Sequence, residues 1–405
     1  MKDIRETLGI KIESPYWDKA YARAVTEPQV PHWMTTEYIE KLHNEYNVLR
    51  ANYDLLVSAV PCVAENPDLC LLAKTLYHII GEKTKSKDTF THFELPKAPE
   101  NVEVTLGYDF VGIFPILAHI EPSWRELENR GVEAAIISDS LVTPDNLVTY
   151  SYERLGKYCL GDVEFMCYDA SLYVNYLRIG RLRFEMYPES QLHVRAFKND
   201  KNDIRILLDG VEVHRSGHLL GAYGCTDKSG SFFAQVTETP DAYEGYAVDS
   251  NTGLCQSFKT TLSKKYWTPI FSKGDNVMKV HIPYGGRLDK AECENSYNRA
   301  REVFAKCYPE IAFKHFVVTC WMLSPELRDI LNPESNIISF QSKYNIYPVR
   351  STALDALMYV YNFRGRSPDE LDFKKLPDDN TLRLGVKQKC LDGNFVHEFG
   401  GFFPW

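Results

Sequence analysis

Polar and apolar residues alternate from Met278 to Pro283, a pattern that predicts a half-buried strand. Gly285 and Gly286 interrupt the alternation, and Asp289 then stands where a helix N-cap belongs, with Glu292 three residues later. Beyond it, apolar residues recur at spacings of four, three, four and three, which is one face of a helix: Cys293, Tyr297, Ala300, Phe304 and Cys307. The segment therefore predicts a strand, a glycine turn and a helix.

A strand that feeds a glycine turn and a helix N-terminus can hold an anion, because free backbone amides and the helix dipole both point there. A purely structural interpretation stays open, since any buried strand followed by an amphipathic helix needs a turn and glycines form turns. The segment lacks the Lys-Ser/Thr pair of a P-loop and the G-x-G-x-x-G pattern of dinucleotide-binding folds.

The rest of the chain divides by its hydrophobic period. Residues 1–165 show mainly helical spacing, so we predict a helical N-terminal part there. In residues 166–405 the period first drops towards two, and strand-like and helix-like segments then alternate. Later strands are predicted at 315–321, at 336–341 and in the tail, and later helices at 351–361 and 381–391. Together these elements predict an α+β fold with a mixed α/β second part.

Glycines mark the predicted breaks in the second part. Gly180 shifts the phase of the alternation around it and predicts a bulge. Asp209 and Gly210 are typical of a hairpin turn. Residues 214–270 hold many glycines and are predicted to be rich in loops.

Composition narrows the class of protein. With 405 residues, 44% hydrophobic and 25% charged, the chain has the makeup of a soluble globular protein of two or three domains. A net charge of −9 argues against a nucleic-acid partner, which needs a basic face. The charged N-terminus is unlike a signal peptide, and no apolar run is long enough for a membrane helix. The ten cysteines form no C-x-x-C pair and no zinc-like spacing, so we expect a reduced, cytoplasmic protein without a metal.

Five segments together resemble a known bacterial family. They are IGRLRFEM (179–186), GYAVDSNTG (245–253), VHIPYGGRLDKAEC (280–293), FVVTCWMLSPELRDIL (316–331) and PESNIISFQ (333–341). This set is similar to the acyltransferase-domain proteins, which pair an N-terminal N-acyltransferase-like domain with a C-terminal GNAT-like domain. The resemblance runs from about residue 105 to the C-terminus. It implies an N-acyltransferase-like domain over 1–165 and a GNAT-like domain over 166–405.

The resemblance implies transfer of an acyl group from acetyl-CoA or another acyl-CoA to an amine of a small molecule. In the GNAT superfamily a central strand parts from its neighbour and binds the pantetheine arm, and the following loop binds the pyrophosphate. Residues 278–283 and 315–321 would be these two strands. The loop residues expected to bind the cofactor are Tyr284, Gly285, Gly286 and Arg287. The loop departs from the superfamily pattern Q/R-x-x-G-x-G/A, and Pro283 has no N–H to offer the pantetheine.

Candidate catalytic and binding residues lie at and after the ends of these strands. His281 has the pKa range of a general base, and the alternative is a histidine hydrogen-bonded within the junction. Cys320 is either a nucleophile or an inert buried thiol. Trp321 is expected to line a substrate groove, and Asn336 and Gln341 either orient a substrate or form ordinary turn contacts.

Further polar residues allow a structural and a functional interpretation. Arg287 either pairs with a phosphate or is a solvated loop residue. A face formed by Arg181, Arg183 and Glu185 is expected to be solvated or salt-bridged. His214 and His218 lack the spacing and the carboxylate partner of a metal site.

The leading hypothesis is an acyl-CoA-dependent N-acyltransferase with His281 as the base. The alternatives are a GNAT-like binding module without catalysis, which recognises a small molecule or a protein, and a hydrolase that uses His281 and Cys320. The N-terminal part can gate the groove, supply the acceptor pocket or join two protomers into a homodimer.

Overall fold

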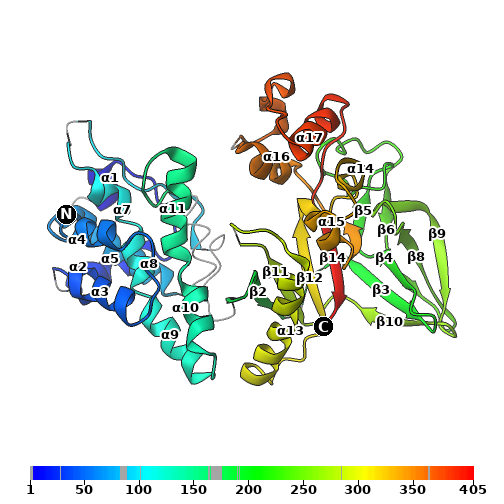
Figure 1. Cartoon of the computed structure of the whole chain (residues 1–405), viewed down its shortest axis with the longest axis horizontal. Coiled ribbons are helices and arrows are strands. Elements are labelled where there is room, and N and C mark those ends of the chain that lie inside the picture. Colours follow the sequence, from blue (N-terminus) through cyan, green and yellow to red (C-terminus); the bar gives the residue numbers. More distant parts are fainter. Residues whose placement is uncertain are drawn as a thin grey trace. The chain divides into compact units, whose positions relative to one another are not determined.

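The computed structural model describes residues 3–27, 29–82, 89–100, 102–162, 165, 176–188, 190, 192–283, 285–363 and 365–405. The chain forms two compact units, unit 1 (Met1–Ile179) and unit 2 (Gly180–Trp405) (Figure 1). The boundary predicted between residues 165 and 166 lies beside residues outside the described ranges, so it stays a prediction.

Unit 1 is helical, as the spacing of its apolar residues predicts. Its α-helices are α1 (Ile4–Leu8), α2 (Trp17–Thr26), α3 (Thr36–Asn44), α4 (Tyr53–Ala64), α5 (Pro67–Ile80), α7 (Leu106–Phe110), α8 (Ile113–Leu117), α9 (Ile120–Asn129), α10 (Ala134–Leu141) and α11 (Thr143–Leu155), and β1 (Tyr176–Ile179) ends the unit. Local signals set several of these bounds: Asn66 caps α5 and Pro67 occupies its first turn, where a missing N–H costs nothing.

A buried carboxylate ties distant parts of unit 1 together. Asp145 on α11 is only 1% exposed. It accepts hydrogen bonds from the backbone N–H groups of Arg50, Ala51 and Asn52 at 2.7–2.9 Å. A buried charge needs such partners, so this contact fixes the segment before α4 against the start of α11.

None of the described helices alone is both long enough and apolar enough to cross a membrane. The pair α4 and α5 meets the length and composition criteria together, with a bend of 109° between the two helices.

The first sheet of unit 2 has the order β2 (Leu182–Tyr187), β11 (Val277–His281), β12 (His315–Cys320), β14 (Phe399–Pro404) and β13 (Asn345–Pro348). The β11–β12 pair is parallel and the other neighbours are antiparallel. Helix α13 (Lys290–Cys307) connects the parallel pair. Its Tyr297 packs between Phe184 of β2 and Phe316 of β12, with ring centroids 6.1 and 5.2 Å away.

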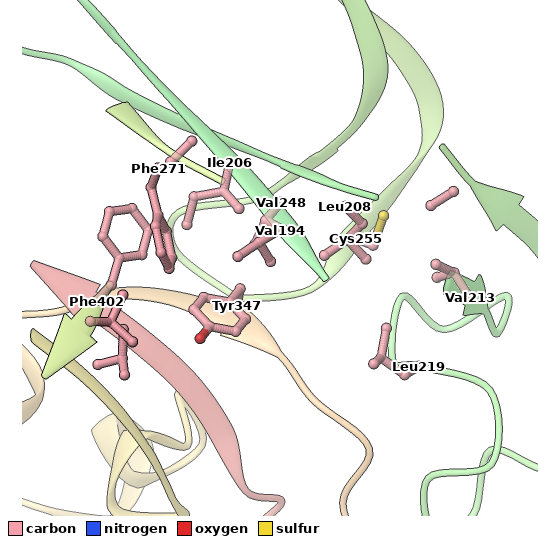
Figure 2. Close-up of a cluster of buried hydrophobic side chains, with 14 residues drawn as sticks. Val194, Ile206, Leu208, Val213, Leu219, Val248, Cys255, Phe271, Tyr347 and Phe402 are labelled. Carbon is pink, nitrogen blue, oxygen red and sulfur yellow. The ribbon is translucent and has the colours of Figure 1, made fainter. Parts of the chain in front are cut away.

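A second sheet packs on the first. Its strands are β3 (Val194–Asn199), β4 (Ile204–Leu208), β7 (Thr237–Glu238), β8 (Ala242–Val248), β9 (Cys255–Ser263) and β10 (Trp267–Phe271), and β5 (Val211–Val213) pairs with β6 (Phe232–Ala234). Figure 2 shows the core between the sheets, where Phe402 and Tyr347 of the first sheet meet Phe271, Ile206 and Val194 of the second. The α+β prediction is confirmed.

Two local predictions about turns were wrong, and the prediction of loops over residues 214–270 held only for the first part. Residues 214–231 form turns and loops that contain Gly217, Gly221, Gly224 and Gly230, whereas β6 to β10 lie within residues 232–271. Gly180, with a φ of 63°, forms with Arg181 the turn between β1 and β2 instead of a bulge. Asp209 and Gly210 do not close a hairpin, because β4 pairs with β3 and β8 whereas β5 pairs with β6.

The last third of the chain matches its predicted elements except at one segment. Helices α16 (Leu354–Tyr361) and α17 (Thr381–Leu391) fall where helices were expected, and a short helix α14 (Leu327–Ile330) precedes them. Residues 336–341, predicted as a strand, form helix α15 (Asn336–Gln341). The Ser335 side chain caps this helix at the Ile338 N–H, a signal that outweighs the short apolar run.

Substitution of Phe316 on β12 tests the packing of the first sheet against α13. The Phe316 side chain is fully buried, so the Phe316→Ala variant is expected to unfold with a free energy lower by about 3–5 kcal/mol, because truncating a buried aromatic leaves a cavity. Phe258 on β9 is 59% exposed, and Phe258→Ala serves as the matched control with nearly wild-type stability. Urea denaturation followed by circular dichroism measures both variants. Equal stability of the two would contradict the packing described here.

Candidate functional site

The hydrogen-bond ladder between β11 and β12 ends early. The two strands pair only at Val277–His315, Met278–Phe316 and Lys279–Val317. Beyond that point β11 continues to pair with β2, and β12 continues to pair with β14 as far as Cys320. Each strand therefore keeps its outer partner while the two central strands part. Beyond Lys279 and Val317 the facing backbone groups of the two strands do not pair with each other. An extended ligand can pair with these groups instead.

The loop after β11 turns through two glycines in the left-handed region. Gly285 has a φ of 82° and Gly286 a φ of 73°. A Cβ added at Gly285 would meet no atom within 4 Å, so the backbone there faces open space. Tyr284, predicted to bind the cofactor, lies outside the described residues. Gly286 and Arg287 are exposed in the same loop.

The start of α13 differs from the expected row of free amides. Asp289 is the N-cap, as predicted, and its carboxylate accepts hydrogen bonds from the N–H groups of Ala291 and Glu292 at 2.9 and 3.2 Å. These two donors are thus occupied by a side chain of the protein itself. An anion at this point would have to use the peptide groups of the preceding loop.

Arg181 organises that loop. Its Nε donates to the carbonyl of Arg287 at 2.9 Å, and its two terminal nitrogens donate to Pro283 at 2.9 Å and Gly286 at 3.1 Å. The expectation of a solvated or salt-bridged face did not include these contacts, in which the Arg181 guanidinium donates to three main-chain carbonyls.

His281 ends β11 and contacts Glu185 of β2. Its Nε2 lies 2.9 Å from Glu185 Oε2, and Lys279 Nζ lies 3.2 Å from the same oxygen. Burial lowers the pKa of His281 below its ordinary value, although the hydrogen bond to Glu185 acts in the opposite sense. The imidazole is therefore neutral at neutral pH.

Glu185 is ionised under the same conditions. Burial alone would raise its pKa, but the hydrogen bond with His281 and the charge of Lys279 outweigh burial and lower it. A neutral imidazole beside a carboxylate has the composition of a proton-accepting pair. The side chain of His281 is 32% exposed, so a reactant can reach it.

The remaining candidates occupy the end of β12 and helix α15. Burial raises the pKa of the Cys320 thiol to about 12, which keeps it protonated at neutral pH. Trp321 is 6% exposed and packs in a cluster with Leu327 and Leu357. Gln341 is 1% exposed, and its side-chain amide donates to the Ser324 carbonyl at 2.8 Å.

The structure brings only part of the predicted set together. His281, Gly285, Gly286 and Arg287 follow one another along β11 and its loop. Trp321 and Gln341 are committed to packing and internal hydrogen bonds, and Asn336 begins α15. Within the described residues no group of three or more His, Cys, Asp or Glu side chains can hold a metal ion.

Sequence reasoning missed Glu185 and Arg181 as members of the site. Both lie about a hundred residues before their partners, and only the strand register brings them together. The alternation in residues 182–187 placed Arg183 and Glu185 on one face, which was a usable signal. The alternation alone did not show which strand would pair with residues 182–187.

Comparison with known proteins agrees with this architecture. Comparison with curated protein sequences finds no match. Among solved structures, an acyltransferase in complex with decanoyl-CoA and teicoplanin is 18% identical, with a TM-score of 0.63 over 99% of this chain and 98% of that chain. An acyltransferase in complex with CoA and 10C-teicoplanin is 17% identical, with the same TM-score and coverage. At these identities the likeness shows a shared fold.

The family follows from a match along the sequence itself. The model of the GNAT-like C-terminal domain matches residues 176–403. Apart from the last residue of β14, this range holds the strands of the described residues, including the parted pair, and it spans more than half of the chain. The protein therefore belongs to the family that carries a GNAT-like C-terminal domain.

Proposed function

We propose that this protein is an acyl-CoA-dependent N-acyltransferase that acylates an amine of a small molecule. The observation that carries the proposal is the early end of the β11–β12 ladder, directly before the left-handed glycine loop. The parted edges offer main-chain donors and acceptors to the amide-containing pantetheine arm of CoA. Gly285, Gly286 and Arg287 are then in position for the diphosphate.

The structural relatives support a thioester donor. They were solved with CoA, octanoyl-CoA or decanoyl-CoA, and two of them also hold teicoplanin or 10C-teicoplanin. We infer that this chain uses an acyl-CoA as well, and that its acceptor is a small molecule with an amine. Acetyl-CoA, octanoyl-CoA and decanoyl-CoA are the donors to compare.

His281 is proposed as the base of the reaction. The acceptor nitrogen attacks the thioester carbonyl while the imidazole takes a proton from that nitrogen. The carbon–sulfur bond then breaks, and the CoA thiolate leaves and takes up a proton. Glu185 holds the imidazole in one orientation and favours the imidazolium that forms, as a carboxylate does for a catalytic histidine.

A binding module without catalysis is the second candidate, and two residues favour it. Pro283 has no N–H for a pantetheine contact. Asp289 places a carboxylate at the start of α13, where it repels a phosphate. A hydrolase that uses a Cys320 thiolate is disfavoured, since the thiol pKa is raised to about 12.

Acyl-CoA binding can be measured by thermal shift. A ligand that binds only the folded state at about a hundredfold its Kd stabilises it by about 2.7 kcal/mol, which corresponds to a rise in Tm of roughly 5–10 °C for a unit of this size. We expect such a rise with at least one of acetyl-, octanoyl- and decanoyl-CoA. The absence of a shift with millimolar concentrations of all three would rule out the transferase and favour the binding module.

Replacement of His281 tests the base. His281→Ala is expected to lower kcat by about 10²–10⁴-fold in a free-thiol release assay, the range that general base catalysis contributes. His193, an exposed histidine of the same unit, provides the matched control, and His193→Ala should retain wild-type turnover. Equal rates for the two variants would remove His281 from the mechanism.

The pH dependence of kcat/KM distinguishes the effects of Glu185 and Lys279 on the pKa of His281. In the wild type the acidic limb should have its midpoint below 6.5, because the pKa of His281 is lowered. Glu185 favours the protonated imidazole, so Glu185→Gln should move this midpoint to lower pH. Lys279 disfavours it, so Lys279→Met should move the midpoint to higher pH. Shifts in the same direction would contradict the assignment.

Cys320 provides a negative control for covalent catalysis. Cys320→Ser should keep turnover within about twofold of the wild type, because a thiol with so high a pKa is a poor nucleophile at neutral pH. Mass spectrometry under single-turnover conditions should find no acyl group on the protein. An acylated Cys320 in the wild type, together with the loss of the pre-steady-state burst in Cys320→Ser, would restore the thiol mechanism.

A further inference from the structure

Arg181 contacts the loop between β11 and α13 but has no part in the reaction proposed above. Its guanidinium donates to the carbonyls of Pro283, Gly286 and Arg287 at 2.9–3.1 Å. Its own backbone N–H donates to Ser296 Oγ of α13 at 2.9 Å. One residue, in the turn that precedes β2, therefore joins the loop to the helix.

These contacts determine the direction of the peptide groups in the loop. A trans peptide is planar, and its C=O and N–H point in opposite directions. When the carbonyls of Gly286 and Arg287 point at the guanidinium, the N–H groups of Arg287 and Leu288 point away from it. The cation also neutralises the negative ends of these dipoles, and the positive ends point away from it. Consecutive N–H groups of this kind bind phosphate oxygens.

The packing around the glycines agrees with this arrangement. A Cβ at Gly286 would lie 3.6 Å from Arg181 Nε, so the guanidinium packs directly against the Gly286 backbone. On Gly285 a Cβ would meet nothing within 4 Å. Since Asp289 already occupies the Ala291 and Glu292 amides, the loop is the part of this junction whose peptide groups remain to serve an anion.

We propose that Arg181 is a positioning residue that holds the β11–α13 loop in the form that binds the diphosphate of CoA. The inference rests on the proposed function. It assigns to Arg181 an indirect role: the side chain contacts the loop carbonyls, and the loop amides contact the phosphates. Loss of Arg181 should therefore weaken the binding of ligands that carry the diphosphate and spare those that lack it.

Calorimetric titration of the full chain with CoA and with pantetheine, which lacks the diphosphate and nucleotide, tests this role. For Arg181→Ala we expect a CoA affinity lower by about tenfold or more, the loss that removal of hydrogen bonds to a charged group brings. Pantetheine affinity should stay within about twofold. Arg301, whose guanidinium also donates to a backbone carbonyl but at Pro404, supplies the matched control: Arg301→Ala should leave both affinities unchanged.

The outcomes distinguish this inference from the proposed function. A wild-type protein that binds neither CoA nor acyl-CoA would overturn the proposed function and the role of Arg181 with it. A wild type that prefers CoA over pantetheine, together with an Arg181→Ala variant that keeps this preference, would overturn the role of Arg181 alone. An equal loss of both ligands would show general damage and would also overturn it. Should Arg181→Ala fail to fold, Arg181→Lys allows the same test, because an ammonium cannot replace the planar fork that spans three carbonyls.

Discussion

The separation of β11 and β12 is the constraint on which the rest of unit 2 depends. Each strand is held by its outer neighbour, and Phe316 and Tyr297 anchor the paired half against α13. The strands can part at one end because the sheet is stabilised at the other. A buried aromatic core thus supports a stretch of backbone that is left available for a partner, in the way a rigid scaffold commonly supports a binding edge.

Two cross-strand contacts give this edge its chemistry. Glu185 reaches diagonally across the β2–β11 pair to His281, and Arg181 reaches from the turn before β2 to the loop after β11. The same short segment, residues 181–185, therefore contacts both His281 and the loop. Its arginine contacts main-chain carbonyls of the loop and its glutamate contacts the His281 imidazole, so opposite charges within one short segment contact two neighbouring parts of the same edge.

Local patterns predicted the elements that carry their own signals. The alternation before Gly285, the Asp289 cap and the helical spacing after it correspond to β11, the observed N-cap and α13. The range predicted for α17 is the observed range. These features depend on neighbours within a few residues, which a sequence displays directly.

The features that were missed had an ambiguous local pattern or depended on distant partners. Residues 336–341 are a short apolar run that suits either a strand or a helix, and the Ser335 cap decided between them. Gly180 is a turn because its strand folds back there, and its φ cannot be deduced from spacing alone. Gln341 and Trp321 have types suited to binding and lie in the interior of the fold, and their role in substrate binding stays a prediction. The position of Glu185 beside His281 follows from a register between strands about a hundred residues apart.

The place of β14 has a consequence for how the protein is made. This strand lies between β12 and β13, although residues 399–404 are the last of the sheet to be synthesised. A nascent chain that has reached β13 still lacks the strand that joins β13 to β12, and the outer edge of β12 stays open until then. Unit 2 must therefore complete its sheet after translation of these residues, and a chain shortened before Phe399 would leave that edge free to associate with other molecules.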